Sequence, residues 1–117
     1  MASVTIEGDE LLIAMSLLDE VLSFHGSFRM PLTHVTNAHV SSAGDLELRW
    51  RLLGTGAGSL KTAGIFTTPQ GIVFCDLAGK QECLVIETRG ERFPRIAVTL
   101  DAGQDPKATA LEICRRI

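Results

Sequence analysis

A glycine-rich segment, Gly54 to Ser59, lies shortly before Lys61 and resembles a phosphate-binding loop. Such a loop needs glycine directly before its lysine, so that backbone amides can wrap the phosphates, and Leu60 stands there instead. A helix should then follow with its N-terminus facing the anion, but residues 63–68 have the pattern of a strand. Ser59 also stands where the dinucleotide-binding pattern has its third glycine. We therefore interpret the segment as a loop between strands and do not expect it to bind nucleotides.

Basic side chains flank this predicted loop and could bind an anion. Arg49 and Arg51 alternate with Trp50, so on a strand the two arginines point to the same face. Lys61 follows the loop, whose amides, including that of Gly56, could add donors. The candidate anion-binding residues are therefore Arg49, Arg51, Gly56 and Lys61. The alternative is that the two arginines serve only solubility.

The candidate nucleophiles Cys75, Ser16 and Ser59 lack the base and orienting partner that nucleophilic catalysis requires. Cys75 lies in an apolar strand beside Asp76, whose charge would raise the thiol pKa rather than activate the thiol. The acidic pairs in the sequence are typical of turns and solvated faces. We predict no catalytic residues and no enzyme activity.

Three histidines, His25, His34 and His39, are the only candidate imidazole ligands for a metal. His34 and His39 are five residues apart, an odd spacing that places them on opposite faces of a strand, and no cysteine lies at ligand spacing from them. His25 precedes Gly26 at a predicted helix end, where it can cap free carbonyls. We predict no metal site and no cofactor.

Composition describes one ordinary folded domain over residues 1–117. Apolar residues make up 45% and charged residues 21% of the sequence, which excludes disorder. The net charge of −3 argues against nucleic-acid binding, and also against a membrane surface. No export signal is visible, so we predict a cytoplasmic location. Cys75, Cys83 and Cys114 are odd in number without a Cys-x-x-Cys pair, which favours reduced thiols.

The first half of the chain predicts a hairpin turning at Gly8-Asp9 and then a short helix over about residues 17–25. Strands follow at residues 28–30 and 35–40, with one turn at 32–34 between them. Residues 45–53 alternate like a half-buried strand, although a distorted helical turn is the rival interpretation.

The second half predicts a four-strand meander and a terminal helix. The strands fall at residues 63–67, 72–77, 83–88 and 93–100. Asp105-Pro106 opens the helix as N-cap and first helical residue. Its predicted apolar face consists of Ala108, Leu111, Ile113, Cys114 and Ile117. We predict a mainly β (α+β) fold of about seven antiparallel strands, as a small barrel or two packed sheets capped by this helix.

The chain resembles small uncharacterised bacterial proteins of pleckstrin-homology-like (PH-like) fold in two consecutive stretches. The first is residues 16–26, which end in His25-Gly26, and the second is residues 29–35, which contain Pro31-Leu32. The Gly54-Thr55-Gly56 loop and the hairpin at residues 89–93 are similar to the same proteins. This resemblance covers nearly the whole chain and implies the capped barrel. It implies no activity that can be assigned to named residues.

Two functions remain open. The first is a non-catalytic interaction module that binds a protein or peptide, with homodimerisation through a strand edge or the helix face as one form. The second is recognition of an anionic ligand or phosphorylated lipid headgroup by the basic residues around the Gly54–Lys61 loop. We favour the first, because no charged or catalytic cluster is strong enough to require the second.

Overall fold

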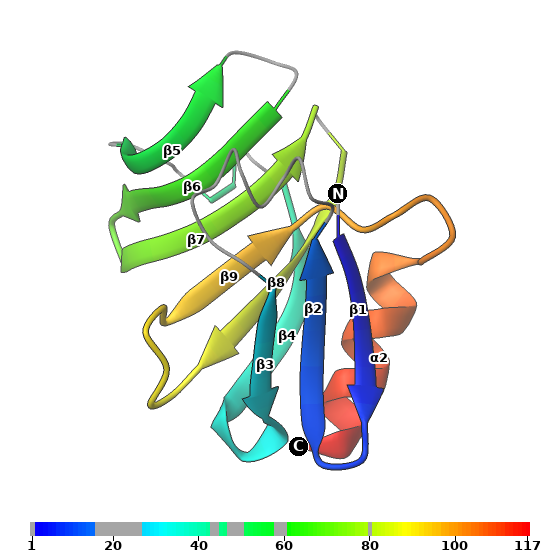
Figure 1. Cartoon of the computed structure of the whole chain (residues 1–117). Helices are drawn as coiled ribbons and strands as arrows, with labels where there is room; N and C mark the ends of the chain where they lie inside the picture. Colours follow the sequence, from blue (N-terminus) through cyan, green and yellow to red (C-terminus); the bar gives the residue numbers. More distant parts are fainter. Residues whose placement is uncertain (1, 16–26, 43–44, 47–50, 58–60, 80) are drawn as a thin grey trace.

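The computed structural model describes residues 2–15, 27–42, 45–46, 51–57, 61–79 and 81–117, with the backbone alone for residues 51–57 and for Lys61. The predicted short helix over residues 17–25 lies outside the described residues, as do Trp50 and His25. The described elements form two sheets and one helix (Figure 1).

The first sheet has three antiparallel strands in the order β1-β2-β3. They are β1 (Ala2–Glu7), β2 (Glu10–Met15) and β3 (Phe28–Pro31). The predicted hairpin at Gly8-Asp9 is confirmed, with Glu7 opposite Glu10. Gly8 has a φ of 58°, a conformation that glycine adopts without the Cβ penalty of other residues.

The second sheet has six strands in the order β4-β8-β9-β7-β6-β5. Their bounds are β4 (Val35–Ser41), β5 (Arg51–Ala57), β6 (Lys61–Thr68), β7 (Gly71–Ala78), β8 (Cys83–Thr88) and β9 (Arg95–Val98). A 3₁₀ turn over Leu32–His34 joins the two sheets, as the sequence predicts.

The predicted meander is wrong in its order, because β9 lies between β7 and β8 and runs parallel to β7. Ile96, Ala97 and Val98 are consecutive and almost fully buried. A strand at the rim of a sheet exposes part of its surface, whereas a central strand covered on both faces buries successive residues. The central position of β9 therefore suits its apolar sequence better than the end of a meander. The sheet is consequently mixed rather than wholly antiparallel.

The glycine-rich segment also differs from its prediction. Gly54 to Ala57 form the end of β5 and pair with β6, with Gly54 opposite Gly64, so they are not a loop. Glycine has little strand propensity but keeps both backbone hydrogen-bonding groups, and two facing glycines let the strands pair without side-chain constraints. The ambiguous segment 45–53 contributes a turn at residues 45–46 and then the start of β5 at Arg51.

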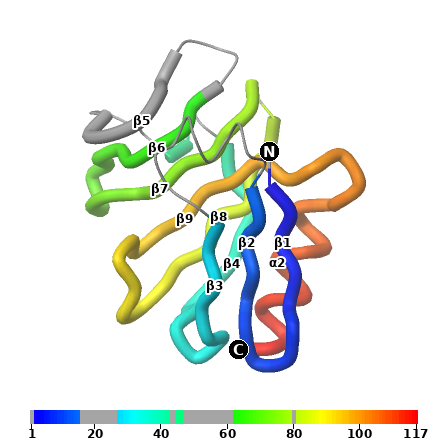
Figure 2. Tube along the Cα trace, viewed as in Figure 1, coloured from blue at the N-terminus to red at the C-terminus, as the bar shows by residue number. Residues whose placement is uncertain are grey.

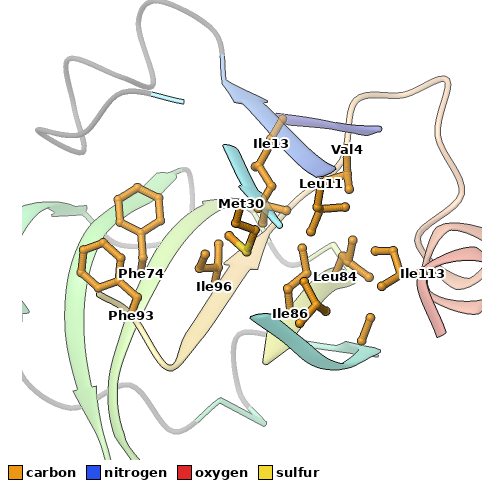
Figure 3. Close-up of a cluster of buried hydrophobic side chains, with 14 of the residues drawn as sticks. Val4, Leu11, Ile13, Met30, Phe74, Leu84, Ile86, Phe93, Ile96 and Ile113 are labelled. Atoms are coloured by element: carbon orange, nitrogen blue, oxygen red, sulfur yellow. The ribbon is translucent and has the colours of Figure 1, made fainter. Parts of the chain in front are cut away.

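The main core lies between the two sheets and the C-terminal helix α2 (Pro106–Arg116). Val4, Leu11 and Ile13 of the first sheet face Leu84 and Ile86 of the second (Figure 3). Phe74 and Phe93 pack with Phe28 at the other end of this layer. A second buried cluster, which includes Cys75, Val85 and Ala97, occupies the opposite face of the six-stranded sheet. The described residues thus form two packed sheets, joined by one isolated bridge between Ala2 and Leu100, and not a closed barrel.

The helix begins as predicted, since the Asp105 side chain accepts a hydrogen bond from the backbone N–H of Lys107 and Pro106 is its first residue. Its predicted apolar face is wrong for four of five residues, since Ala108, Leu111, Cys114 and Ile117 are exposed. Ile113 is fully buried, but Leu111 is 60% exposed. The chain instead buries Ala110 together with Ile113, because this side of α2 packs on β4 and β8.

Candidate functional site

The candidate anion site from the sequence lies mostly beyond what the structure describes. Arg49 is outside the described residues, and only backbone positions are described for Arg51, Gly56 and Lys61. Arg51 begins β5, Gly56 pairs with Thr62, and Lys61 begins β6. Arg51 and Lys61 therefore stand at opposite ends of the β5–β6 hairpin rather than together at its loop.

The outer edge of β1 borders a surface groove, and α2 lies on its other side. In Figure 1, β1 and α2 lie side by side. The groove between them has a volume of about 420 Å³. Val4, Thr5 and Ile6 form the strand wall, and Ala108, Thr109, Glu112, Ile113 and Arg116 form the helix wall. Strand and helix run side by side in the same direction, so one extended chain could lie between them.

The start of the β1 edge is already occupied by the chain that follows β9. The N–H of Ala2 donates to the Thr99 carbonyl at 2.9 Å, and the N–H of Asp101 donates to the Ala2 carbonyl at 2.8 Å. Figure 2 shows this segment, in orange, passing the start of β1 before it turns towards α2. These two bonds are one step of a parallel ladder.

The next step of this ladder is made by a side chain. The N–H of Val4 donates to Gln104 Oε1, and Gln104 Nε2 donates to the Val4 carbonyl, both at 2.8 Å. Strand geometry then turns the N–H and C=O of Ile6 to the same side as those of Val4, towards the groove. Within the described part of the chain, no group bonds to the backbone of Ile6 on this side.

The strand wall of the groove carries no charged side chain, and the helix wall carries one ion-pair network. Glu112 accepts hydrogen bonds from Arg115 and from Arg116 Nε, the latter at 3.2 Å. These arginines hold the pKa of the Glu112 carboxyl below its ordinary value. The charge of Glu112 is therefore already balanced by its own helix.

A second depression of about 540 Å³ adjoins the groove at Arg116. It lies where the β1–β2 hairpin meets the 3₁₀ turn, and Arg89 and Asp9 also line it. Two guanidinium groups and one carboxylate of the described residues therefore border this depression.

The two histidines that the structure describes, His34 and His39, each face a different carboxylate. His34 Nδ1 lies 2.5 Å from Glu91 Oε2, and His39 Nε2 lies 3.2 Å from Glu87 Oε2. Among the described residues, no three acidic, histidine or cysteine side chains come together as metal ligands. His34 belongs to the 3₁₀ turn and His39 to β4, so the two are not on one strand as the spacing argument assumed.

The cysteines separate into two buried thiols and one exposed thiol. Burial raises the pKa of Cys75 far above its ordinary value, and the neighbouring Asp76 raises it further, as the sequence predicts. Burial likewise raises the pKa of Cys83 to about 11. Cys75 and Cys83 are on strands separated by β9, and Cys75 is level with Val85 rather than with Cys83. Their Cα atoms are therefore more than about 9 Å apart, which is too far for a disulfide.

Sequence reasoning missed the groove residues Val4, Ile6 and Gln104. The alternation of apolar and polar residues at Val4-Thr5-Ile6 predicts a strand. It does not predict that this strand lies at the edge of a sheet with free backbone groups. Gln104 stands just before the helix cap, and no local pattern connects it with Val4, one hundred positions away.

Comparisons with protein-family models, with curated proteins and with solved structures found no match to this chain. Of the described helices, none has the length and apolar character needed to cross a membrane.

Proposed function

We propose that this chain is a non-catalytic interaction module that binds an extended peptide segment of a protein partner along the edge of β1. The observation that carries this proposal is the groove between β1 and α2, with the backbone N–H and C=O of Ile6 directed into it. An exposed strand edge binds an extended peptide through main-chain hydrogen bonds, and adjacent pockets take alternate side chains.

The surroundings of the edge support a peptide rather than a second folded copy. The helix forms the opposite wall of the groove, so a partner strand must enter as a single extended chain without a sheet of its own beside it. The exposed Ala108 on the helix wall offers apolar surface to one side chain of such a peptide. A homodimer through the exposed outer side of α2, around Leu111, is a separate surface and does not compete with this groove.

The fold class is part of the same proposal. A PH-like module is supported by the two packed sheets and the C-terminal helix that covers them. The mixed six-stranded sheet, with β9 inserted between β7 and β8, is a departure from the antiparallel arrangement that the resemblance implies.

Recognition of an anionic ligand through Arg49, Arg51, Gly56 and Lys61 is the second candidate. We rank it lower because Gly54 to Ala57 are engaged in the ladder with β6, and their alternate amides are committed to that strand. An anion site predicts binding that weakens steeply as salt rises, whereas strand addition predicts little salt dependence.

The test uses one backbone donor. Ile6→Pro removes the N–H that faces the groove and leaves the bonds between β1 and β2 intact, because proline is tolerated where an edge strand faces outward. Ile6→Val keeps this donor and is the matched control.

A display library of random twelve-residue peptides is selected on the wild-type chain, and the strongest peptide is synthesised with blocked termini. We expect Ile6→Pro to abolish its binding and Ile6→Val to retain it; a library without any selected peptide, or equal binding to both variants, contradicts the proposal.

A further inference from the structure

The Gln104 side chain occupies a position that belongs to a strand. A parallel ladder that continued beyond Ala2 would have a backbone carbonyl accepting from the Val4 N–H and a backbone N–H donating to the Val4 carbonyl. The chain leaves the edge at Asp101, where the N–H of Gln104 bonds back to the Asp101 carbonyl at 2.9 Å. The carboxamide of Gln104 then returns and makes both missing bonds at 2.8 Å.

A carboxamide has the same acceptor and the same kind of donor as a peptide unit, which makes the Gln104 contact informative about the ligand. The edge at Val4 is satisfied by one amide group, and the same edge at Ile6 is open towards the groove. A peptide that pairs only with Ile6 gains one ladder step. A peptide that also takes the place of Gln104 gains two.

We propose that Gln104 is an internal competitor for the groove, and that a bound partner segment displaces its amide from Val4. This inference rests on the proposed function, because it describes how the peptide-binding groove is regulated. Displacement releases Gln104 from the strand edge while Asp101 stays bonded to Ala2, so binding in the groove also changes the segment directly before α2.

The charges of the groove specify the occupant further. Glu112 is held by Arg115 and Arg116, and the strand wall carries no charged side chain. A charged residue of the partner that faces Val4 and Ile6 would lose water here without meeting a charged group on the strand wall, which is unfavourable. The partner segment is therefore extended and uncharged over the residues that face Val4 and Ile6.

Three variants at position 104 separate competition from other effects. Gln104→Ala removes both bonds to Val4, and Gln104→Glu keeps the acceptor but removes the donor. Gln81→Ala removes an exposed glutamine that does not line the groove and is the matched control. The probes are the blocked twelve-residue peptide selected from the random library and the same peptide with every backbone nitrogen methylated, which keeps its side chains but loses its donors. Their dissociation constants are measured by fluorescence anisotropy at low and at moderate salt.

Removal of the competitor is expected to tighten binding. Gln104→Ala should bind the unmethylated peptide about tenfold more tightly than the wild type, because two bonds no longer have to be broken. Gln104→Glu should lie between them, Gln81→Ala should match the wild type, and the methylated peptide should bind none of them. In the wild type, the Gln104 side-chain NH₂ resonances should shift when peptide is added.

The two possible failures can be told apart. If the peptide binds the wild type and Gln104→Ala with equal affinity, or binds the variant more weakly, Gln104 is not a competitor while the peptide-binding function stands. If selection on both the wild type and Gln104→Ala yields no peptide, the groove does not bind peptides and both proposals fall. If the selected peptides carry charged residues at the positions that face Val4 and Ile6, the inferred chemistry of the partner is wrong.

Discussion

Replacement of Ile113 tests how α2 is docked on the sheets. Ile113 is fully buried in the main core, whereas Leu111 on the same helix is 60% exposed (Figure 3). Truncation of a buried isoleucine to alanine costs the transfer free energy of the lost methyl groups and that of the cavity left behind, in total about 2 to 5 kcal/mol. The higher helix propensity of alanine returns less than about 0.5 kcal/mol. We therefore expect Ile113→Ala to lower the free energy of unfolding by about 3 kcal/mol.

This loss is large relative to the stability of a domain of this size, which is about 5 to 15 kcal/mol. The entropy of unfolding of 117 residues is about 0.25 kcal/mol per kelvin, so a loss of about 3 kcal/mol lowers the melting temperature by about 12 °C. Leu111→Ala is the matched control, because it removes a similar side chain from the solvent side of the same helix. Its expected change is within about 0.5 kcal/mol.

The measurement is urea unfolding followed by far-ultraviolet circular dichroism, with thermal unfolding as a second readout. The denaturant midpoint should fall for Ile113→Ala while the m-value stays unchanged, since the same surface is exposed on unfolding. If Leu111→Ala costs as much as Ile113→Ala, the helix packs through the wider apolar face that the sequence suggests, and the groove next to Ile113 is misplaced. If both variants lose a negligible amount of free energy of unfolding, α2 contributes little to the core.

Two further predictions concern the thiols. Cys114 is exposed, whereas Cys75 and Cys83 are buried and have raised pKa values. Iodoacetamide at neutral pH should therefore label one thiol in the native protein and three in urea, as counted by mass spectrometry. Labelling of all three thiols in the native protein would contradict this burial. Because the Cys83 pKa rises from about 9.0 unfolded to about 11 folded, the unfolded state loses its proton first, and the urea midpoint should fall as the pH rises from about 9 to about 11. Cys83→Ser should weaken this fall.

Local signals in the sequence were sufficient for the elements that depend on neighbouring residues. The Gly8-Asp9 turn joins two segments of alternating apolar and polar residues, and the predicted hairpin is confirmed. It depends on a local property, because glycine permits the positive φ that the turn requires. Asp105-Pro106 opens α2 for similarly local reasons, since the cap bonds to an amide two residues away. The turn at Leu32–His34 also follows from its own residues and the proline before it.

The errors arise where distant segments decide the structure. The insertion of β9 between β7 and β8 depends on which strands bury both faces, and the adjacency of strands along the chain favoured a meander instead. The face of α2 depends on what β4 and β8 present to it, so a helical pattern that included Leu111 could not be resolved from the helix alone. Residues 54–57 are predicted to be a loop because glycine has a low propensity for strands. In the structure, pairing of these residues with β6 outweighs that low propensity.

The groove shows how local and distant constraints combine at one residue. The cap at Asp105 fixes where α2 begins, and the parallel step at Ala2 fixes where the preceding segment leaves the sheet edge. Between these two points the chain has a short turn, so the side chain at position 104 is held within reach of Val4. An apolar side chain there would leave the Val4 N–H and C=O to water and the edge open to any extended chain. A glutamine closes one ladder step with hydrogen bonds alone, and a peptide that supplies the same bonds can therefore take its place without disturbing the core beneath.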